Sequence, residues 1–192
     1  MTTPFAEPMT SPPVDEMKLA QDAVSNAEAF TQLYHQHVTR VYRYHMAHTG
    51  NIEDAEDLTS QTFIAVLEGL RSFRASGPIA ARIMGIASRK RLIHFRGNRY
   101  EIPLDEALHY PSPSLPTDNA AIRRLRLESV ARALKQITAD RAEAIILAYF
   151  GGLSHLEVGR LLNKSEAAVK MLIARGLQDL RERTALALEV EP

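Results

Sequence analysis

Positive charge gathers in one part of this 192-residue sequence. Residues 71–100 carry eight Arg or Lys residues and no acid, although the whole chain has 23 basic and 23 acidic residues and no net charge. Residues 1–70 carry three basic against ten acidic residues, and residues 101–122 carry four acids and no base. A block of cations without anions suits the phosphate backbone of a nucleic acid. The segregated charge therefore predicts partners of both signs, which the neutral average conceals.

An acidic cluster is the first candidate for metal chemistry. Glu53, Asp54, Glu56 and Asp57 lie within five positions and could imitate a magnesium site. A catalytic metal site needs convergent ligands and groups that bind a substrate, and the first turn of one exposed helix supplies neither. We therefore interpret these carboxylates as a helix start, where they face the positive end of the helix dipole.

The remaining reactive residue types do not form a catalytic constellation. Four of the seven histidines fall on one predicted helix, but only His45 and His48 have i, i+3 spacing, and zinc needs three or four ligands. The sequence has no cysteine, which excludes disulfides and thiolate metal sites and fits a reducing cytoplasm. It has no G-x-S-x-G, glycine-rich phosphate loop or H-E-x-x-H motif. We expect no enzyme, no cofactor and no metal.

The elements that must position these residues are predicted to be helices. Apolar residues recur at spacings of three and four, and no strand-like alternation competes with them. Gly50 ends one helix, Asn51 caps the next, and Pro78 begins a third. The first domain is expected to contain helices at about 26–48, 52–70 and 78–96.

The chain divides into two small helical domains and three connecting or terminal segments. Residues 1–25 hold four prolines among the first thirteen positions and are predicted to be a disordered tail, without the features of a secretory signal. Residues 101–121 are acidic and proline-rich and are predicted to be an extended linker. No apolar run is long enough to span a membrane. The expected ranges are a first domain at 26–100, a second at 122–185 and a C-terminal tail at 186–192.

Two helix-start signals lie only eleven residues apart in the second domain. Ser154 and Glu157 form an S-x-x-E capping box, Asn163 is predicted to be a left-handed C-cap, and Ser165 caps the following helix. Two helices joined by so short a turn form a helix-turn-helix, whose second helix can lie in the major groove of DNA. Its buried stripe is predicted to be Val169, Leu172, Ile173, Gly176, Leu177 and Leu180.

The opposite face of that second helix carries the candidate DNA contacts. Small residues near its N-terminus would allow a close approach to base edges, and Lys170 and Arg175 can reach phosphates. The same geometry also occurs as plain packing in helical bundles, so the motif alone leaves both interpretations open. The predicted face is Ser165, Glu166, Ala167, Lys170, Met171 and Arg175.

Two runs in this order resemble the sigma-70 family of bacterial RNA polymerase sigma factors, in particular the extracytoplasmic-function (ECF) group. The run DAEDLTSQTF, from Asp54 to Phe63, is similar to the D-A-E-D-L-x-Q-E-x-F run of the family's first domain. The run YFGGLSHLEVGRLLNKSEAAVKMLIARGLQDLR, from Tyr149 to Arg181, resembles the family's reader of the promoter −35 element. The resemblance covers residues 26–185.

The resemblance implies roles for the two domains. One helix would dock on the clamp helices of the polymerase β′ subunit through Asp54, Glu56, Asp57, Ser60, Gln61 and Phe63. The basic block would engage and melt the −10 element through Arg74, Arg82, Arg89, Lys90, Arg91, Arg96 and Arg99. The helix-turn-helix would read the −35 element, and the linker would thread towards the active site and RNA exit of the polymerase. Core RNA polymerase, through its β′ clamp and β flap, and promoter DNA are the implied partners, and an anti-sigma factor stays open as another.

The sequence departs from the family at positions that bear on melting. Ser60 and Gln61 stand where the family commonly has Gln and Glu, which softens the clamp contact. Arg82, Arg89 and Ile93 replace a usual Trp, Asn and Asp, and the chain has no tryptophan. An unstacked base normally stacks on an aromatic side chain for about 1–3 kcal/mol. The alternatives are therefore an ordinary helix-turn-helix DNA-binding regulator and a degenerate sigma-like protein that binds core polymerase without efficient melting.

Overall fold

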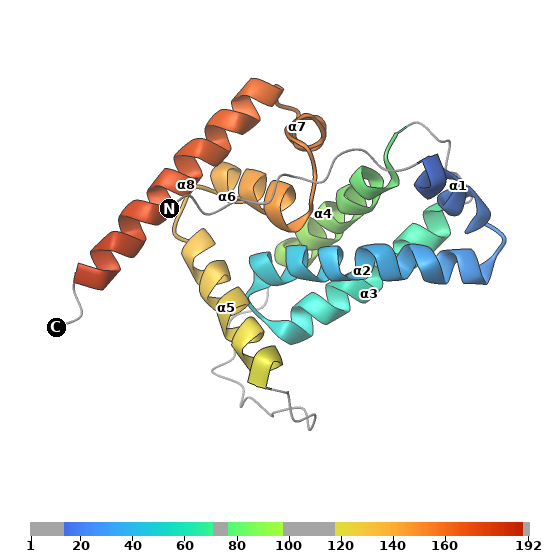
Figure 1. Cartoon of the computed structure of the whole chain (residues 1–192), viewed down its shortest axis with the longest axis horizontal. Coiled ribbons are helices and arrows are strands. Elements are labelled where there is room, and N and C mark those ends of the chain that lie inside the picture. Colours follow the sequence, from blue (N-terminus) through green and yellow to red (C-terminus); the bar gives the residue numbers. More distant parts are fainter. Residues whose placement is uncertain (1–13, 71–76, 98–117, 190–192) are drawn as a thin grey trace.

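The structure, a computed structural model, describes residues 14–70, 77–97 and 118–189. Within these ranges the chain is built from helices and contains no strand (Figure 1). The predicted all-α fold class is therefore confirmed. Residues 101–117 of the predicted linker lie outside the described part of the chain.

The first unit contains α1 (Val14–Asp22), α2 (Ala27–Thr49), α3 (Ile52–Leu70) and α4 (Ile79–Gly97). The side-chain oxygen of Asn26 accepts from the backbone N–H groups of Glu28 and Ala29 at 2.8 and 3.3 Å and so begins α2. Gly50 ends α2 with a φ of 69°, a left-handed conformation that favours glycine. Asn51 then accepts from the N–H of Asp54 at 3.1 Å, which caps α3 as predicted.

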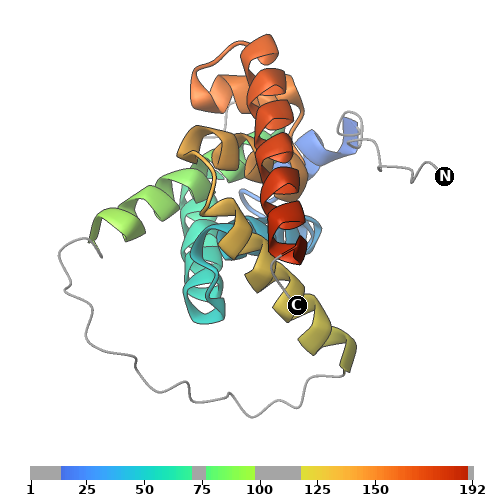
Figure 2. The same ribbon diagram turned by 90° about the vertical axis from the view of Figure 1, so that its left-hand side faces the viewer.

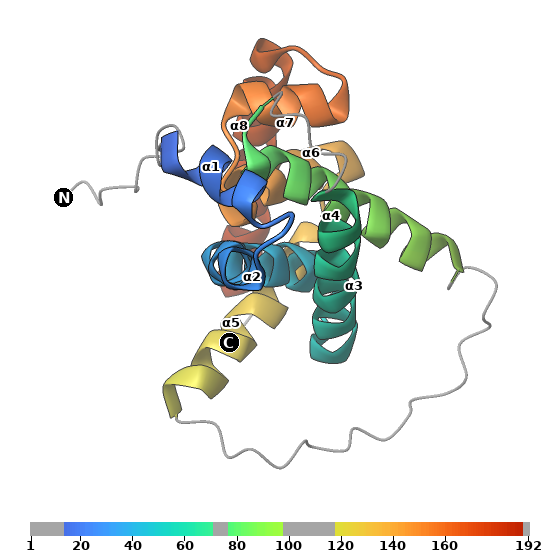
Figure 3. The same cartoon turned by 90° about the vertical axis from the view of Figure 1, so that its right-hand side faces the viewer.

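Helix α1 corrects the prediction of a disordered tail for residues 14–22, whereas residues 1–13 of that predicted tail lie outside the described part of the chain. Its Ala20 is fully buried and Ala23, just after the helix, is 3% exposed, because α1 packs on α2 and α4 (Figure 3). Oε1 of Glu16 also lies 3.0 Å from Nε2 of His37 on α2. The disordered tail was predicted from its proline content. The four prolines all lie in residues 1–13, outside the described part of the chain.

The second unit contains α5 (Asp118–Leu134), α6 (Ala139–Ile145), η1 (Ile146–Phe150), α7 (His155–Leu162) and α8 (Glu166–Glu189). Helix α5 begins inside the predicted linker range, and α8 continues into residues predicted as a C-terminal tail. Helix α6 continues directly into η1, which is one π-helical turn. There the N–H of Gly151 donates to the carbonyl of Ile146 at 2.9 Å.

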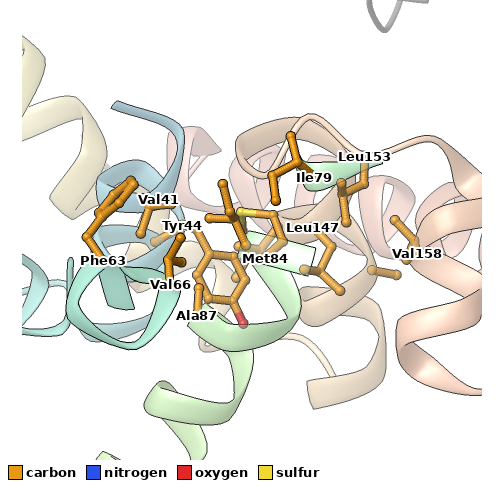
Figure 4. Packing of buried hydrophobic residues seen from close by; sticks show 14 of the residues in the cluster. Val41, Tyr44, Phe63, Val66, Ile79, Met84, Ala87, Leu147, Leu153 and Val158 are labelled. Carbon is orange, nitrogen blue, oxygen red and sulfur yellow. The ribbon is translucent and has the colours of Figure 1, made fainter. Parts of the chain in front are cut away.

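The two units share one hydrophobic core rather than forming separate bodies. Val41, Tyr44 and Met84 from the first unit lie in the same buried cluster as Leu147 and Val158 from the second (Figure 4). Helix α5 and η1 both pack on α2, and α7 contacts α4. Helix α8 runs along one edge of the molecule, over α6 and α7 (Figures 1 and 2).

Candidate functional site

The helix-turn-helix is built from the predicted caps. The N–H of Glu157 donates to Oγ of Ser154 at 3.3 Å, and the Glu157 carboxylate accepts from the N–H of Ser154 at 2.8 Å, which completes the capping box. Asn163 ends α7 with a φ of 54°. Gly159 allows the turn to close, since a Cβ there would lie 2.6 Å from the Lys164 carbonyl oxygen. The short turn therefore fixes α8 against α7.

The buried face of α8 follows the predicted stripe. Val169 is fully buried and Ile173 is 5% exposed, while Leu172, Leu177 and Leu180 pack partly buried against the core. Gly176 lets α8 approach α6 closely, because a Cβ at this position would lie 2.7 Å from Cδ1 of Ile145. The packing leaves the opposite face of α8 open to solvent.

The structure places the predicted −35 residues together on this open face. Ser165 caps α8 by accepting from the N–H of Ala168 at 3.2 Å. Nζ of Lys170 lies 2.7 Å from Oε1 of Glu166 one turn earlier, and this hydrogen bond and charge lower the pKa of the Glu166 carboxyl. The following residues of the predicted set are exposed in the structure: Ser165, Glu166, Ala167, Lys170, Met171 and Arg175.

A shallow hollow beside this face adds two cations that the sequence analysis missed. It has a volume of about 250 Å³ and is lined in part by Arg141 of α6 and by Lys164 in the turn. Lys164 pairs with Asp140 at 3.0 Å, and Arg141 pairs with Asp179 of α8. The sequence spacing could not predict the role of Arg141, because this residue belongs to α6 and comes close to α8 only when the two helices pack together. The remaining lining residues are Ala168, Met171, Leu172 and Arg175.

The second candidate surface is a stripe on the last turns of α4. Arg89, Leu92, Ile93 and Arg96 follow i, i+3, i+4, i+7 spacing and all are exposed. Leu92 and Ile93 are 44% and 59% exposed, so two apolar side chains lie between two guanidinium groups. Phe95, beside the stripe, is 41% exposed. This α4 stripe, with Phe95, offers both cations for phosphates and an aromatic ring on which a base can stack.

Phe95 adds an exposed aromatic ring to the basic block, a residue that the sequence analysis did not single out. The sequence analysis compared only the positions at which the family has Trp, Asn and Asp. Residues 71–100 contain Phe73, Phe95 and Tyr100. The structure shows that Phe95 is exposed, whereas the other two lie outside its described part.

Two arginines predicted to bind the −10 element make contacts inside the protein instead. A terminal nitrogen of Arg82 donates to the Gly69 carbonyl at 3.1 Å and ties α4 to the end of α3. Arg91 pairs with Glu143 of α6 at 2.9 Å. Lys90 is half-buried, whereas Arg89 and Arg96 are exposed. The predicted residues Arg74 and Arg99 lie outside the described part of the chain.

The third candidate surface is the acidic face of α3. Glu56, Asp57 and Ser60 are exposed, and Gln61 donates from Nε2 to Oδ2 of Asp57 at 2.8 Å. Asp54 at the start of the helix lies 3.8 Å from Nε2 of His94 on α4. Five of the six residues predicted for polymerase binding therefore lie on or at the edge of one face.

Phe63 is the exception, and its predicted contact with polymerase is corrected. It is 5% exposed and packs in the core, where its ring meets that of Tyr34 edge-on at 4.7 Å. Phe63 therefore fixes α3 against α2 from inside and cannot itself touch a partner. The run that resembles the family thus mixes exposed and buried positions, as an amphipathic helix must.

A hollow of about 300 Å³ lies between α2 and α3 next to the acidic face. It is partly apolar, because Tyr34, Val38 and Tyr42 line it at successive i, i+4 positions of α2. Each of these three side chains is only half-buried. The remaining lining residues are Thr39, Glu56, Thr59 and Ser60.

The part of the chain that the structure describes has neither a metal-binding cluster nor a helix suited to a membrane. No group of three or more His, Asp or Glu side chains converges there in a way that could hold a metal ion. Among the described helices, none combines the length and the apolar character needed to span a bilayer.

Comparisons with known proteins identify both units. Residues 33–100 match the family description Sigma-70 region 2, and residues 127–180 match Sigma-70, region 4. The chain is 30% identical over 168 residues to the ECF RNA polymerase sigma factor BldN of Streptomyces coelicolor, covering 85% of this chain and 64% of BldN. It is 28% identical over 183 residues to the ECF RNA polymerase sigma factor SigK of Mycobacterium tuberculosis, covering 90% of this chain and 97% of SigK.

Solved structures show the same fold. The sigma factor RpoE of Bartonella quintana, solved in complex with the anti-sigma factor NepR, is 19% identical with a TM-score of 0.62, covering 86% of this chain and 99% of that one. CnrH, solved with the cytosolic domain of CnrY, is 24% identical with a TM-score of 0.68, covering 92% of this chain and 99% of that one. The chain belongs to the sigma-70 family of RNA polymerase sigma factors, with its regions 2 and 4 in α2–α4 and α5–α8.

Proposed function

We propose that this protein is a sigma factor that directs core RNA polymerase to specific promoters. The acidic face of α3 docks on the β′ clamp, the α4 stripe engages the −10 element, and the exposed face of α8 reads the −35 element. The polymerase β flap is a further contact of the second unit. The protein works in the cytoplasm as a dissociable subunit, without catalysis of its own.

One observation carries this proposal: a region 2 unit and a region 4 unit occur in family order, each with a solvent-exposed face of the right chemistry. An acidic face on α3 suits a basic partner surface, whereas α4 and α8 expose cations that suit phosphates. An ordinary helix-turn-helix regulator needs the second unit but has no use for the acidic face or the α4 stripe.

Transcription in a purified system tests the proposal. Core polymerase is incubated with promoter templates, with and without this protein, and the RNA starts are mapped. We expect starts at defined positions only when the protein is present. A helix-turn-helix regulator would bind duplex DNA but leave core polymerase inactive, and a degenerate sigma would bind core without producing RNA. Either result would contradict the proposal.

The matched control is a protein whose recognition helix is altered but whose fold is retained. Arg175 and Met171 are exposed on α8, so the double change Met171→Ala and Arg175→Ala leaves the buried stripe intact. This variant should still bind core polymerase and should lose starts at promoters that depend on a −35 element. If the unaltered protein and the variant start equal amounts of RNA at these promoters, α8 does not take part in promoter recognition.

A further inference from the structure

A buried polar cluster joins the two units. We name Tyr44, His48, Arg91 and Glu143 the interdomain hub. The hydroxyl of Tyr44 donates to Oε1 of Glu143 at 2.9 Å and accepts from Nε of Arg91 at 3.2 Å. A terminal nitrogen of Arg91 lies 2.9 Å from Oε2 of Glu143. Glu143 comes from α6 in region 4, whereas its three neighbours come from α2 and α4 in region 2.

The hub holds its charged pair almost out of water. The side chains of Arg91 and Glu143 are 16% and 12% exposed. Burial raises the pKa of the Glu143 carboxyl, while Arg91 and the Tyr44 hydroxyl oppose this shift. Nε2 of His48 lies 3.3 Å from Oε2 of Glu143 without a hydrogen bond, and burial holds its pKa well below the ordinary value, so the ring is neutral. Arg91 therefore provides the positive charge that faces Glu143.

Such a pair resists the loss of either member. Removing one partner of a buried ion pair leaves an uncompensated charge, which costs more than the intact pair contributes. Separation of the two units removes both partners together and returns both to water. We therefore expect that substitution of one hub residue destabilises the closed state, whereas separation of the two units leaves no buried charge unpaired.

Other contacts close the same interface. Nζ of Lys135, in the turn that follows α5, donates to the carbonyl of Thr49 at the end of α2 at 3.0 Å. Gly85 of α4 faces Leu161 of α7 so closely that a Cβ on Gly85 would lie 3.3 Å from the leucine Cδ2 atom. Helix α4 is thus in direct contact with the first helix of the helix-turn-helix.

This closed arrangement does not fit a promoter. By their positions, the −10 and −35 elements lie about 25 base pairs apart, which is about 85 Å of duplex at 3.4 Å per base pair. Here α4 touches α7, and α7 packs on α8, so the two DNA-reading helices are separated by a single helix. Both elements can be bound only after regions 2 and 4 separate. The twenty residues between α4 and α5 have a contour length of about 70 Å, which permits such a separation.

We propose that Glu143 is an internal latch: it occupies Arg91, a cation of the basic block, with a carboxylate in the position that a promoter phosphate would take, and thereby holds the free protein in a closed, DNA-incompetent state. This inference rests on the proposed function for the meaning of closure, but the closure itself is a property of the free chain. Core polymerase and promoter DNA bind the open state and so shift the population towards it.

Distance measurement on the free full-length protein tests the latch. The chain has no cysteine, so spin labels can be placed at Gln36→Cys on α2 and Arg181→Cys on α8, both of them exposed positions. Double electron–electron resonance then reports the distance distribution between the units. Glu143→Arg places two cations together in the hub, and we expect a shift from one short distance to a broad set of longer distances. Circular dichroism checks that the helices remain.

A charge swap and a matched control make the result specific. Adding Arg91→Glu to Glu143→Arg restores an opposite-charge pair and should restore much of the short-distance population. Asp140→Arg also reverses an acid of α6, whose partner Lys164 lies 3.0 Å away in the same unit, and should leave the distance unchanged. If Glu143→Arg keeps the short distance, or Asp140→Arg opens the protein equally, the latch is wrong.

A milder variant tests occlusion if the reversed charge disrupts folding. Glu143→Gln keeps the shape of the side chain and removes its charge, with Glu28→Gln, at an exposed position of α2, as its control. We expect Glu143→Gln to bind promoter duplex several-fold more tightly than the control in the absence of polymerase, with a longer mean distance between labels. A longer distance with unchanged DNA affinity would refute occlusion by the latch, and an unchanged distance would refute the latch itself. Neither outcome depends on whether the protein initiates transcription.

Discussion

At the scale of single residues, local hydrogen bonds were predictable and long-range partners were not. The capping box of Ser154 and Glu157 and the left-handed Asn163 follow from residue types a few positions apart, and the structure contains all of them. Arg82 and Arg91 looked like any other cation of the basic block. Their partners Gly69 and Glu143 lie far along the chain or in the other unit, so no local pattern could show that they are occupied.

His45 makes a prediction about acid stability. Its Nε2 lies 3.0 Å from the hydroxyl oxygen of Thr62, and that hydroxyl already donates to the Leu58 carbonyl. The Nε2–H of His45 must therefore be the donor, which leaves Nδ1 buried without a proton or a partner. Burial lowers the pKa of His45 to about 3, with Arg91 and His94 adding to the shift. Protonation in the native state is thus strongly disfavoured.

The free energy of unfolding should therefore fall as the pH drops below about 6.5, because the unfolded chain takes up a proton that native His45 refuses. The expected contribution is about 1.4 kcal/mol per pH unit. Urea unfolding between pH 7 and 4.5 measures it. His45→Gln keeps a donor towards Thr62. It should reduce the pH dependence of the free energy of unfolding by the amount expected for one proton. His35→Gln, at an exposed position of the same helix, should leave this pH dependence unchanged. Equal slopes for both variants would contradict the assignment.

The acidic face of α3 makes a prediction about polymerase binding. Asp57 and Gln61 are hydrogen-bonded one turn apart, so changing both to Arg reverses the local charge without touching the core. The affinity for core RNA polymerase should fall at least tenfold in a pull-down titration, which is a loss of about 1.4 kcal/mol or more of binding free energy. The control is Gln32→Arg with Gln36→Arg, two exposed positions one turn apart on α2. Similar losses for both pairs would show that added charge alone weakens binding.

At the scale of elements, the helices were predictable from periodicity and breakers, and their ends were less so. Helix α1 was missed because composition outweighed its short apolar pattern, which is buried only through contact with α2 and α4. The π-turn η1 was missed because its hydrogen-bonding shift has no residue signature in the sequence. The α8 stripe was identified correctly because six apolar positions fit one helical face.

Recognition helix α8 makes a prediction about salt dependence. Lys170→Ala should weaken DNA binding to a similar degree on all sequences and should reduce the salt slope by about one, as expected for one phosphate contact. Glu166→Ala should raise affinity, because it frees Lys170 from the 2.7 Å ion pair, and should change the preferred −35 sequence. Fluorescence anisotropy over a salt series measures both. Arg126→Ala, an exposed cation on α5, serves as the control and should leave the slope unchanged.

At the scale of the whole molecule, the sequence predicted two domains, but the structure shows two units on one core. Each unit has its own helical pattern, which is all that sequence periodicity can report. The packing of Tyr44 and Met84 with Leu147 and Val158 joins residues that are far apart in the sequence, so the periodicity of either unit could not show it.

The α4 stripe leads to a prediction about promoter opening. The α4 stripe has two apolar residues and Phe95 but no tryptophan, so we expect promoter binding with core polymerase and efficient opening only on supercoiled or easily melted templates. Phe95→Ala should reduce opening further, by up to about 3 kcal/mol for one lost base stack. Permanganate footprinting measures the opening.

Leu125→Ala on α5, which also removes an exposed apolar side chain, is the control for Phe95→Ala and should open promoters normally. Strong opening by the unaltered protein on a relaxed template with a GC-rich −10 element would show that the arginine-rich α4 melts DNA unaided. Unchanged opening by Phe95→Ala would remove the phenylalanine from the stacking role.

The close approach of Gly85 to Leu161 also limits how such proteins can be recombined. A chimera would join region 2 of one parent to region 4 of another at the connecting segment. A larger residue at 85, or a recipient without an acid at 143, would leave a steric clash or a buried unpaired arginine at the seam. A chimera of this protein should therefore close normally only when the facing surfaces of α4, α6 and α7 come from the same parent.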